Sequence, residues 1–252
     1  MTTSTSRTVG IDLAAAPERT AAAVLEWSPE CARVVALALP ADDATLREVC
    51  AGADRIGVDA PIGWPSAFVD FVTAHRAHRT PPGLGLDQRG ARRPLTLRVT
   101  DDYVARTTGL TPLSVSADLI ANVAFRAAGL LADLGVDDRV NGRAVEAYPA
   151  AALHHWGLAH RRYKGAANAV ALAELVSALE RAAPWLDLGE HRALCTRRDD
   201  AFDAVITAMI ARAAQLDATV SPPPDLDRSV IADEGWIHIP RCTLADLVGT
   251  DT

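Results

Sequence analysis

The chain has 252 residues, of which 49% are hydrophobic and 23% charged, and its formal net charge at pH 7 is −7. This composition is typical of a globular protein with a full hydrophobic core, and it excludes a disordered chain and a uniformly basic coat for nucleic acid. No apolar run reaches the length of a membrane span and residues 1–6 lack signal-peptide character, so we expect a cytoplasmic protein without a membrane partner.

The N-terminal part of the chain predicts four strands. They cover residues 7–13, 20–27, 32–39 and 55–59, where apolar side chains are frequent. A turn at Ser28-Pro29 joins the second and third strands, and Asp42 or Asp43 is expected to cap a helix that ends at Cys50. After the fourth strand, the proline-rich turn 61–65 prevents the sheet from continuing.

A long irregular segment, about 66–140, follows this turn. Only 101–107 and 117–134 are predicted to be helical within it, and the stretch 81–85 breaks the chain. No clean linker bounds the segment, so we expect an insertion over the sheet within a single domain that spans 1–252. Residues 75–98 carry six arginines against one aspartate, a local charge of +5 on an otherwise acidic chain. Such a segment is suited to hold phosphate groups.

The remaining elements complete an α/β fold. Residues 143–148 predict a fifth strand, 150–158 and 166–183 predict helices, and the last strong helix covers about 197–216. A short closing strand is expected at 236–239. The order β-β-β-α-β, insertion, β-α places strand one centrally, with strand four beside it.

Two of the predicted strands are near-copies of one another. Val9-Gly10-Ile11-Asp12-Leu13 and Ile56-Gly57-Val58-Asp59-Ala60 each place an aspartate two residues after a glycine. Alternate side chains of a strand share a face, so each aspartate lies on the same face as its glycine. If the strands are parallel neighbours, the two carboxylates stand side by side, and the glycines leave room above the backbone for a divalent cation and its ligand.

The last helix adds further acids. Thr196 and Asp199 fit a capping box, so Asp199 is explained as a cap. Asp200 and Asp203 lie three residues apart and share a face of the helix. Asp203 borders the apolar stripe of this helix, where an acid is costly unless it is paired or bound to a metal. The expected stripe consists of Phe202, Val205, Ile206, Met209 and Ile210.

Together these acids resemble the motif of the ribonuclease H-like superfamily, which includes the RuvC-like resolvases. That motif has an aspartate on strand one, an acid on strand four and Asp-x-x-Asp-Ala on a C-terminal helix, here residues 200–204. More narrowly, the chain resembles domain-of-unknown-function family 429, predicted ribonuclease H-like nucleases. The phrases that carry this resemblance are Gly10-Ile-Asp-Leu13, Gly57-Val-Asp-Ala-Pro-Ile-Gly-Trp-Pro65, Val145-Glu-Ala-Tyr-Pro149, Tyr163-Lys-Gly165, Asp199-Asp-Ala-Phe-Asp-Ala204 and Glu234-Gly-Trp-Ile237.

The resemblance implies a ribonuclease H-like five-stranded mixed sheet, with its strands in the order 3-2-1-4-5 and flanked by helices. It also implies a metal-dependent nuclease that acts on DNA or RNA with a water nucleophile. Carboxylate ligands suit Mg²⁺ or Mn²⁺, and two such ions about 3.5–4 Å apart can activate water and stabilise the leaving oxygen. The expected catalytic residues are Asp12, Asp59, Glu146, Asp200 and Asp203, of which Asp12, Asp59, Asp200 and Asp203 bind metal. The residues expected to hold substrate phosphates are Arg89, Arg92, Arg93, Arg98 and Lys164.

Two other functions share this sheet. One is a phosphotransferase or ATPase of the actin and sugar-kinase type, which needs a glycine-rich phosphate turn after strand one and a second similar domain. This chain has Ala14-Ala-Ala-Pro17 at that turn and little length for a duplicate. The other is a non-catalytic nucleic-acid-binding module. The four scattered cysteines have no short-spaced pair, so a zinc or redox motif is not expected.

Overall fold

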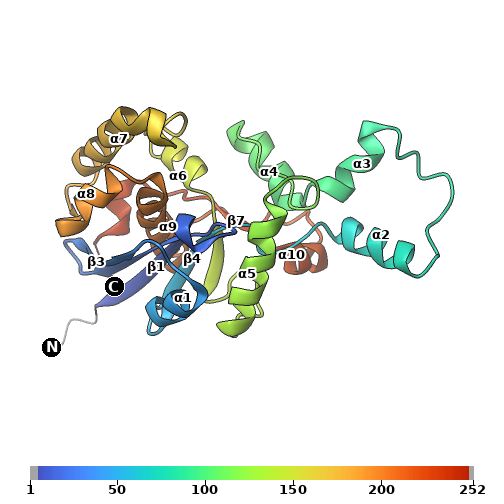
Figure 1. Cartoon of the computed structure of the whole chain (residues 1–252), viewed down its shortest axis with the longest axis horizontal. Helices are drawn as coiled ribbons and strands as arrows, with labels where there is room; N and C mark the ends of the chain where they lie inside the picture. Colours follow the sequence, from blue (N-terminus) through green and yellow to red (C-terminus); the bar gives the residue numbers. More distant parts are fainter. Residues whose placement is uncertain (1–4, 250–252) are drawn as a thin grey trace.

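A seven-stranded mixed sheet forms the centre of the computed structural model, which describes residues 5–249 (Figure 1). In space the strands follow the order β6-β3-β2-β1-β4-β5-β7. Strand β1 pairs antiparallel with β2 and parallel with β4, and the remaining neighbours of β4 and β5 are also parallel. The strands are β1 (Ser6–Asp12), β2 (Ala21–Trp27), β3 (Ala32–Ala38), β4 (Arg55–Asp59), β5 (Ala144–Ala147), β6 (Leu186–Asp187) and β7 (Ile237–His238).

Ten α-helices surround this sheet within residues 5–249, and none of them is long and apolar enough to cross a membrane. Helix α1 begins as predicted, since the side chain of Asp42 accepts a hydrogen bond from the backbone N–H of Thr45 at 2.8 Å. The helices are α1 (Asp43–Cys50), α2 (Ser66–Arg76), α3 (Arg89–Thr96), α4 (Val99–Thr108), α5 (Ala121–Asp133), α6 (Pro149–His155), α7 (Ala169–Ala182), α8 (Arg192–Cys195), α9 (Asp199–Gln215) and α10 (Arg228–Glu234).

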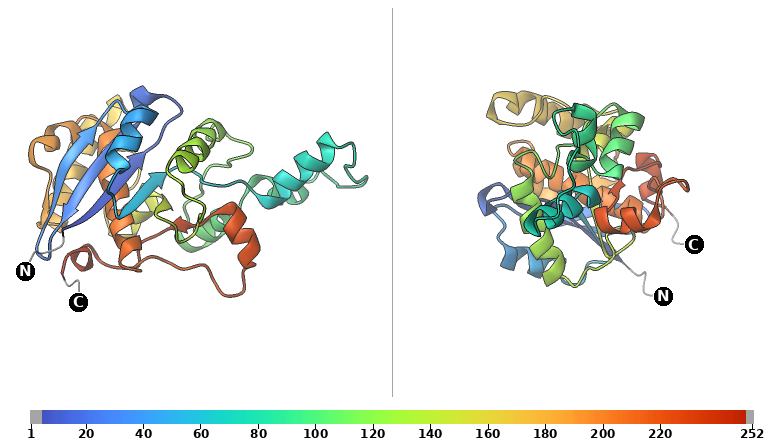
Figure 2. Two further views of the ribbon diagram at one scale, coloured as in Figure 1. Left: turned by 90° about the horizontal axis from the view of Figure 1, so that it is seen from below. Right: turned by 90° about the vertical axis from the view of Figure 1, so that its right-hand side faces the viewer.

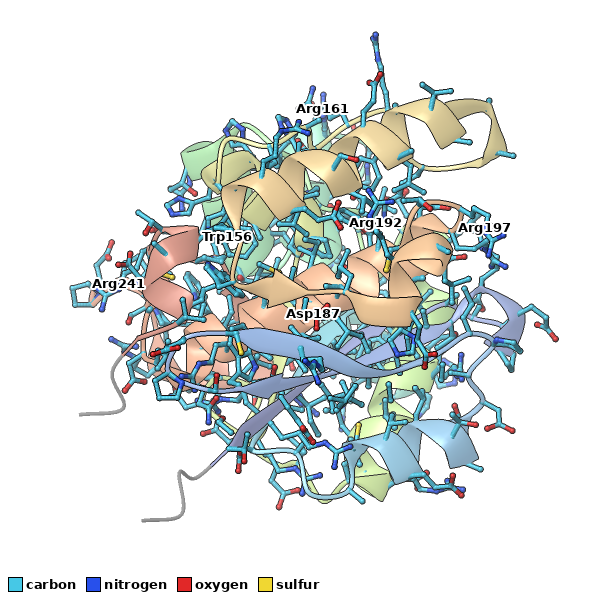
Figure 3. All side chains as sticks on the ribbon, turned by 90° about the vertical axis from the view of Figure 1, so that its left-hand side faces the viewer. Trp156, Arg161, Asp187, Arg192, Arg197 and Arg241 are labelled. Atoms are coloured by element: carbon cyan, nitrogen blue, oxygen red, sulfur yellow. The ribbon has the colours of Figure 1, made fainter. Side chains whose placement is uncertain are left out.

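The sheet separates two hydrophobic layers. Helices α6, α7 and α9 pack on one face with Leu25, Trp27 and Phe202 in their core. Helices α1 and α5 pack on the other face around Ile11 and Ile56. Figure 3 views the β6 edge, where Asp187 is labelled, with helices above and below the strands. Because both faces are covered, the sheet strands are almost continuously apolar.

The predicted five-stranded sheet was incomplete. Strand β7 confirms the closing strand expected at 236–239, and its partner is β5. Strand β6 was not predicted. It consists of two residues that extend the β3 edge in a parallel pairing, and so short a segment has no recognisable sequence pattern.

Helix α9 lies directly on strands β1 and β4 because both have glycine where the helix crosses. Gly10 and Gly57 are register partners in the parallel pair. A Cβ atom at Gly10 would lie 2.1 Å from both Ala204 O and Ala208 N, and one at Gly57 would lie 2.6 Å from Thr207 O. The prediction that these glycines leave room for a bound ligand was therefore wrong: the helix backbone fills this space.

Replacing Gly10 with alanine should lower the free energy of unfolding by about 2–3 kcal/mol, because the added methyl group collides with the helix backbone and cannot rotate away. Urea unfolding measures this loss. Gly129→Ala is the matched control, since Gly129 lies inside α5 with no atom within 4 Å of an added Cβ. The control should be neutral or stabilising by up to about 1 kcal/mol. Equal stability of the two variants would contradict close packing of α9 on β1.

The insertion between β4 and β5 contains four helices rather than the two predicted. Helices α2 and α3 and their connecting loop project away from the sheet as an arm (residues 66–97; Figures 1 and 2). Over the described ranges 66–76 and 89–96, neither helix contains a buried residue. Helix α3 contains Pro94 and few apolar residues, and neither helix has a side-chain N-cap, so both lack clear sequence signals of a helix.

The capping box predicted at Thr196 is not formed. Helix α9 begins at Asp199 after Arg198, and Thr196 Oγ1 instead donates to Ala193 O at 3.1 Å. The expected apolar stripe is fully buried, but burial extends around the helix, from Asp200 to Ala214. A helix that is buried on all sides lies inside a protein, and here it lies between the sheet and the helices above it.

Candidate metal centre

Three aspartates from distant parts of the chain meet at one end of the central strands. One carboxylate oxygen from each of Asp12, Asp59 and Asp203 lies within 4.8 Å of the others. Asp12 ends β1, Asp59 ends β4 and the two are register partners. Asp203 lies in the second turn of α9, one turn before the Thr207 backbone that covers Gly57. The close approach of the helix thus positions the third acid beside the first two.

The three acids differ in exposure and in their partners. Asp203 is fully buried, whereas Asp12 and Asp59 are partly exposed and line a cleft of about 320 Å³. Asp203 Oδ1 accepts a hydrogen bond from the Tyr163 hydroxyl at 2.8 Å, and its Oδ2 lies 2.5 Å from Lys164 Nζ. Lys164 also lines the cleft. Within residues 5–249, neither Asp12 nor Asp59 forms an ion pair.

The pKa values of all three aspartates are raised, and burial is the largest cause for each. The charges of Asp59 and Asp203 raise the pKa of Asp12 further, while the ammonium of Lys164 opposes the shift. The pKa of Asp59 rises to about 7, because the charges of Asp203 and Glu146 add to burial and outweigh Lys164. The metal-free centre therefore resists carrying three negative charges at once.

Replacing Asp59 with asparagine should stabilise the metal-free protein more at pH 8 than at pH 5. Folding raises the pKa of Asp59 from 3.8 to about 7, so the folded state binds more protons and becomes less stable as pH rises through this range. Asparagine does not titrate, so its advantage in unfolding free energy should grow by roughly 1–3 kcal/mol between the two pH values.

Urea unfolding at the two pH values measures this change. The control is Asp225→Asn at an exposed position, which should change the free energy of unfolding only slightly. A constant advantage of Asp59→Asn over this range would show that Asp59 is ionised in the folded protein throughout.

Two of the five predicted acids do not join the centre. Asp200 is buried and binds Arg19 Nη2 at 2.9 Å and Arg198 Nη2 at 2.7 Å, so its charge is already neutralised. Glu146 is also buried and binds both terminal nitrogens of Arg98 at 2.6 Å. Glu146 lines the same cleft, but its carboxylate is held by Arg98 and by the backbone N–H of Ile62. The expected role of Asp200 as a metal ligand therefore has no support in its contacts.

Arg98 is not available to hold a substrate phosphate, which was the role expected from the sequence. It is 1% exposed, and its five N–H donors bind Asp101, Glu146 and the backbone carbonyl of Glu234. No donor is left for a substrate phosphate, so Arg98 joins α4, β5 and α10 into one structure. The spacing of Arg98 and Asp101 could have revealed this pair, because Asp101 is at position N3 of α4 and accepts a hydrogen bond at 2.9 Å from the backbone N–H of the N-cap residue Arg98.

The other predicted arginines lie beside a second cavity. Arg89, Arg92 and Arg93 are exposed and line a pocket of about 470 Å³ at α3. Arg93 forms an ion pair with Asp102, and Arg92 binds the carbonyls of Leu86 and Asp87. Thr111 and Pro112 line both this pocket and the cleft of the aspartates. The arginines therefore flank a surface that continues into the acidic centre.

The donor set fits a hard divalent cation. All three ligands are carboxylates, which suit Mg²⁺ and Mn²⁺, whereas no cysteine or histidine joins this cluster among the described residues. Asp12 and Asp59 face a cleft without an ion-pair partner, so a cation between them would offset their mutual repulsion. The site is therefore chemically suited to hold such an ion.

Comparison with known proteins identifies the chain only at the level of a family. No curated protein and no solved structure matches it significantly. The profile of one family matches residues 10–228, which include the strands of Asp12 and Asp59 and the helix of Asp203. Since this match covers most of the chain, the protein belongs to the family described as Protein of unknown function (DUF429).

Proposed function

We propose that this protein is a Mg²⁺- or Mn²⁺-dependent phosphodiesterase that cleaves DNA or RNA on a ribonuclease H-like fold. The observation that carries the proposal is the convergence of Asp12, Asp59 and Asp203 within 4.8 Å beside a cleft. The central strands follow the order β3-β2-β1-β4-β5, with acids at the ends of β1 and β4 and on a late helix. This arrangement supports the ribonuclease H-like assignment.

The residues of the centre have separate tasks in this proposal. A bound divalent cation supplies Lewis acidity, which lowers the pKa of water and stabilises charge on phosphate oxygens. Asp12 and Asp59 hold the cation at the end of the parallel strands, where their backbone is fixed by the register. Tyr163 orients Asp203 by its hydrogen bond, and Lys164 presents a positive charge to the cleft.

The arm supports nucleic acid as the substrate class. Exposed arginines of α3 line a pocket that meets the cleft at Thr111 and Pro112, so a phosphate chain laid across the centre would reach them. A free mononucleotide does not require a second basic pocket. Nucleic acid is therefore the best match to the combined surface, and a localised basic arm on an acidic protein gives attachment at one place.

The direct test incubates the protein with end-labelled single-stranded, duplex and branched DNA and RNA. We expect cleavage of at least one substrate with Mn²⁺ or Mg²⁺, and none with EDTA. Cleavage that survives EDTA would contradict the metal centre. If no substrate is cleaved and ATP is hydrolysed instead, the phosphotransferase alternative replaces this proposal, whereas binding without any hydrolysis would indicate a nucleic-acid-binding module.

Removing charge from the arm should weaken binding without changing the metal centre. The double substitution Arg89→Gln and Arg92→Gln is expected to raise the Kd for the cleaved substrate about 3- to 10-fold at 100 mM salt. It should also lower the salt dependence of log Kd by about one to two units, one for each phosphate that the protein no longer neutralises. Arg33→Gln is the control. Arg33 is exposed on β3, and two strands, β2 and β1, separate β3 from β4 in the sheet. Equal effects of arm and control would contradict binding at the arm.

A further inference from the structure

Lys164 is the only lysine of the chain, which has 25 lysine and arginine residues in total. This single ammonium lies on the acidic centre, with Nζ 2.5 Å from Asp203 Oδ2. The side chain is 55% exposed and lines the cleft, so it meets the buried carboxylate while facing the space where a substrate would lie. An ammonium is a compact point charge with three donors, and the broad planar fork of arginine does not reproduce it.

The acids around the centre separate into those paired with arginine and a group without an arginine partner. Arg98 pairs with both Glu146 and Asp101, and Asp200 pairs with Arg19 and Arg198. The three remaining aspartates carry −3 against the +1 of Lys164. One divalent cation makes this group neutral. A second would leave an excess of +2 in a partly buried site, which is unfavourable because charges are poorly solvated there.

The contacts of Asp203 also favour a single bound cation. Tyr163 donates a hydrogen bond to Oδ1, and Oδ2 is ion-paired with Lys164, although no donor among the described residues is oriented to hydrogen-bond it. Asp12 and Asp59 have no ion-pair partner within residues 5–249 and stand in register at the ends of neighbouring strands. The free ligands are therefore sufficient for one cation between two strands, while the third carboxylate is occupied by the lysine.

We propose that the centre holds a single divalent cation between Asp12 and Asp59, and that the ammonium of Lys164, held by Asp203, takes the place of a second metal ion. The inference rests on the proposed phosphodiesterase function. It replaces the two-ion scheme that was expected from the sequence with one ion and one ammonium. Lys164 faces the scissile phosphate and stabilises the charge that develops on its oxygens. Water supplies both the hydroxyl that bonds to phosphorus and the proton that ends on the leaving oxygen, so Lys164 is unchanged by the reaction.

The number of bound ions tests this inference independently of activity. Free Mn²⁺ is followed by its electron paramagnetic resonance signal during titration of metal-free protein at pH 7.5. Wild-type protein should bind one Mn²⁺ per chain, Lys164→Met should bind two, and Lys164→Arg, which keeps the positive charge, should bind one. Two ions in the wild type, or a single ion in Lys164→Met, would overturn the inference while leaving a metal-dependent phosphodiesterase intact.

A different result identifies failure of the proposed function itself. If the wild type binds no Mn²⁺, or if Asp12→Asn binds it as tightly as the wild type, the aspartates are not a metal centre. At a Mn²⁺ concentration that fills only the first site of an active enzyme, Lys164→Met should also lower kcat about 100-fold, as expected for the loss of one charge that stabilises a transition state.

The single lysine permits a second measurement. Protein labelled with ¹⁵N only in lysine gives one side-chain ammonium signal, which is visible when the ion pair slows exchange of its protons with water. This signal should be present in the metal-free wild type, persist in saturating Mg²⁺ and disappear in Asp203→Asn. Loss of the signal on addition of Mg²⁺ to the wild type would show that the metal displaces the ammonium, and would overturn the inference.

Discussion

Asparagine in place of Asp12 should abolish metal-dependent cleavage while making the metal-free protein more stable. A metal ion contributes several kcal/mol of transition-state stabilisation, so loss of its principal ligand should lower kcat by about 10³-fold or more. In the absence of metal the same carboxylate is unfavourable, because burial and the charges of Asp59 and Asp203 raise its pKa. Removing it should therefore raise the free energy of unfolding at pH 7.5.

Single-turnover cleavage and thermal unfolding in EDTA measure the two effects. The exposed Asp137 provides the control Asp137→Asn, which should leave both rate and melting temperature nearly unchanged. Addition of Mg²⁺ should raise the melting temperature of the wild type but not that of Asp12→Asn. Residual metal-dependent cleavage at more than a tenth of the wild-type rate would remove Asp12 from the mechanism.

The largest loss of stability is expected when Arg98 is replaced with methionine. This change leaves Glu146 and Asp101 buried without their counter-charge, and breaking a buried ion pair in this way costs about 3–5 kcal/mol. The packing of α4, β5 and α10 around Arg98 should also become less tight. Urea unfolding measures the loss, and the change in m-value reports whether the folded state has expanded.

The control for this substitution is Arg106→Met on the same helix. Arg106 is exposed and its only described contact is with the carbonyl of Asp102, so the change should stay within about 0.5 kcal/mol. Combining Arg98→Met with Glu146→Gln should recover part of the stability, since it removes one of the stranded charges. A loss below about 1 kcal/mol in Arg98→Met would show that water replaces the guanidinium.

The sequence predicted the centre better than its surroundings. The repeated Gly-x-Asp pattern placed Asp12 and Asp59 side by side because register and pleat follow directly from strand periodicity. Asp203 was identified because an acid beside an apolar stripe requires a partner. The partners of Asp200 and Glu146 were not predictable, since Arg19 and Arg98 lie 181 and 48 residues away from them. Only the folded chain brings such pairs together.

Local sequence patterns also could not predict the role of the glycines or the path of the insertion. A missing side chain at Gly10 is compatible with a ligand, a turn or a crossing helix, and the sequence does not distinguish these. Helices α2 and α3 bury nothing, α3 contains Pro94, and neither has a side-chain N-cap, so the sequence signals of a helix are weak in them. The pocket of Arg89 and Arg92 depends on how this arm folds back to Thr111 and Pro112.

The crossing of α9 over β1 determines when the centre is completed during synthesis. Thr8 binds the carbonyl of Ala208 across 200 residues of sequence, and Asp203 reaches Asp12 only through this contact between the ends of the chain. At about 5–20 residues per second, a ribosome needs roughly 10–40 s to pass from Asp12 to Asp203. Once Asp59 has been added, the nascent chain carries two of the aspartates for the rest of that interval and neither the third nor the helix that positions it. A chain released early therefore lacks a complete centre.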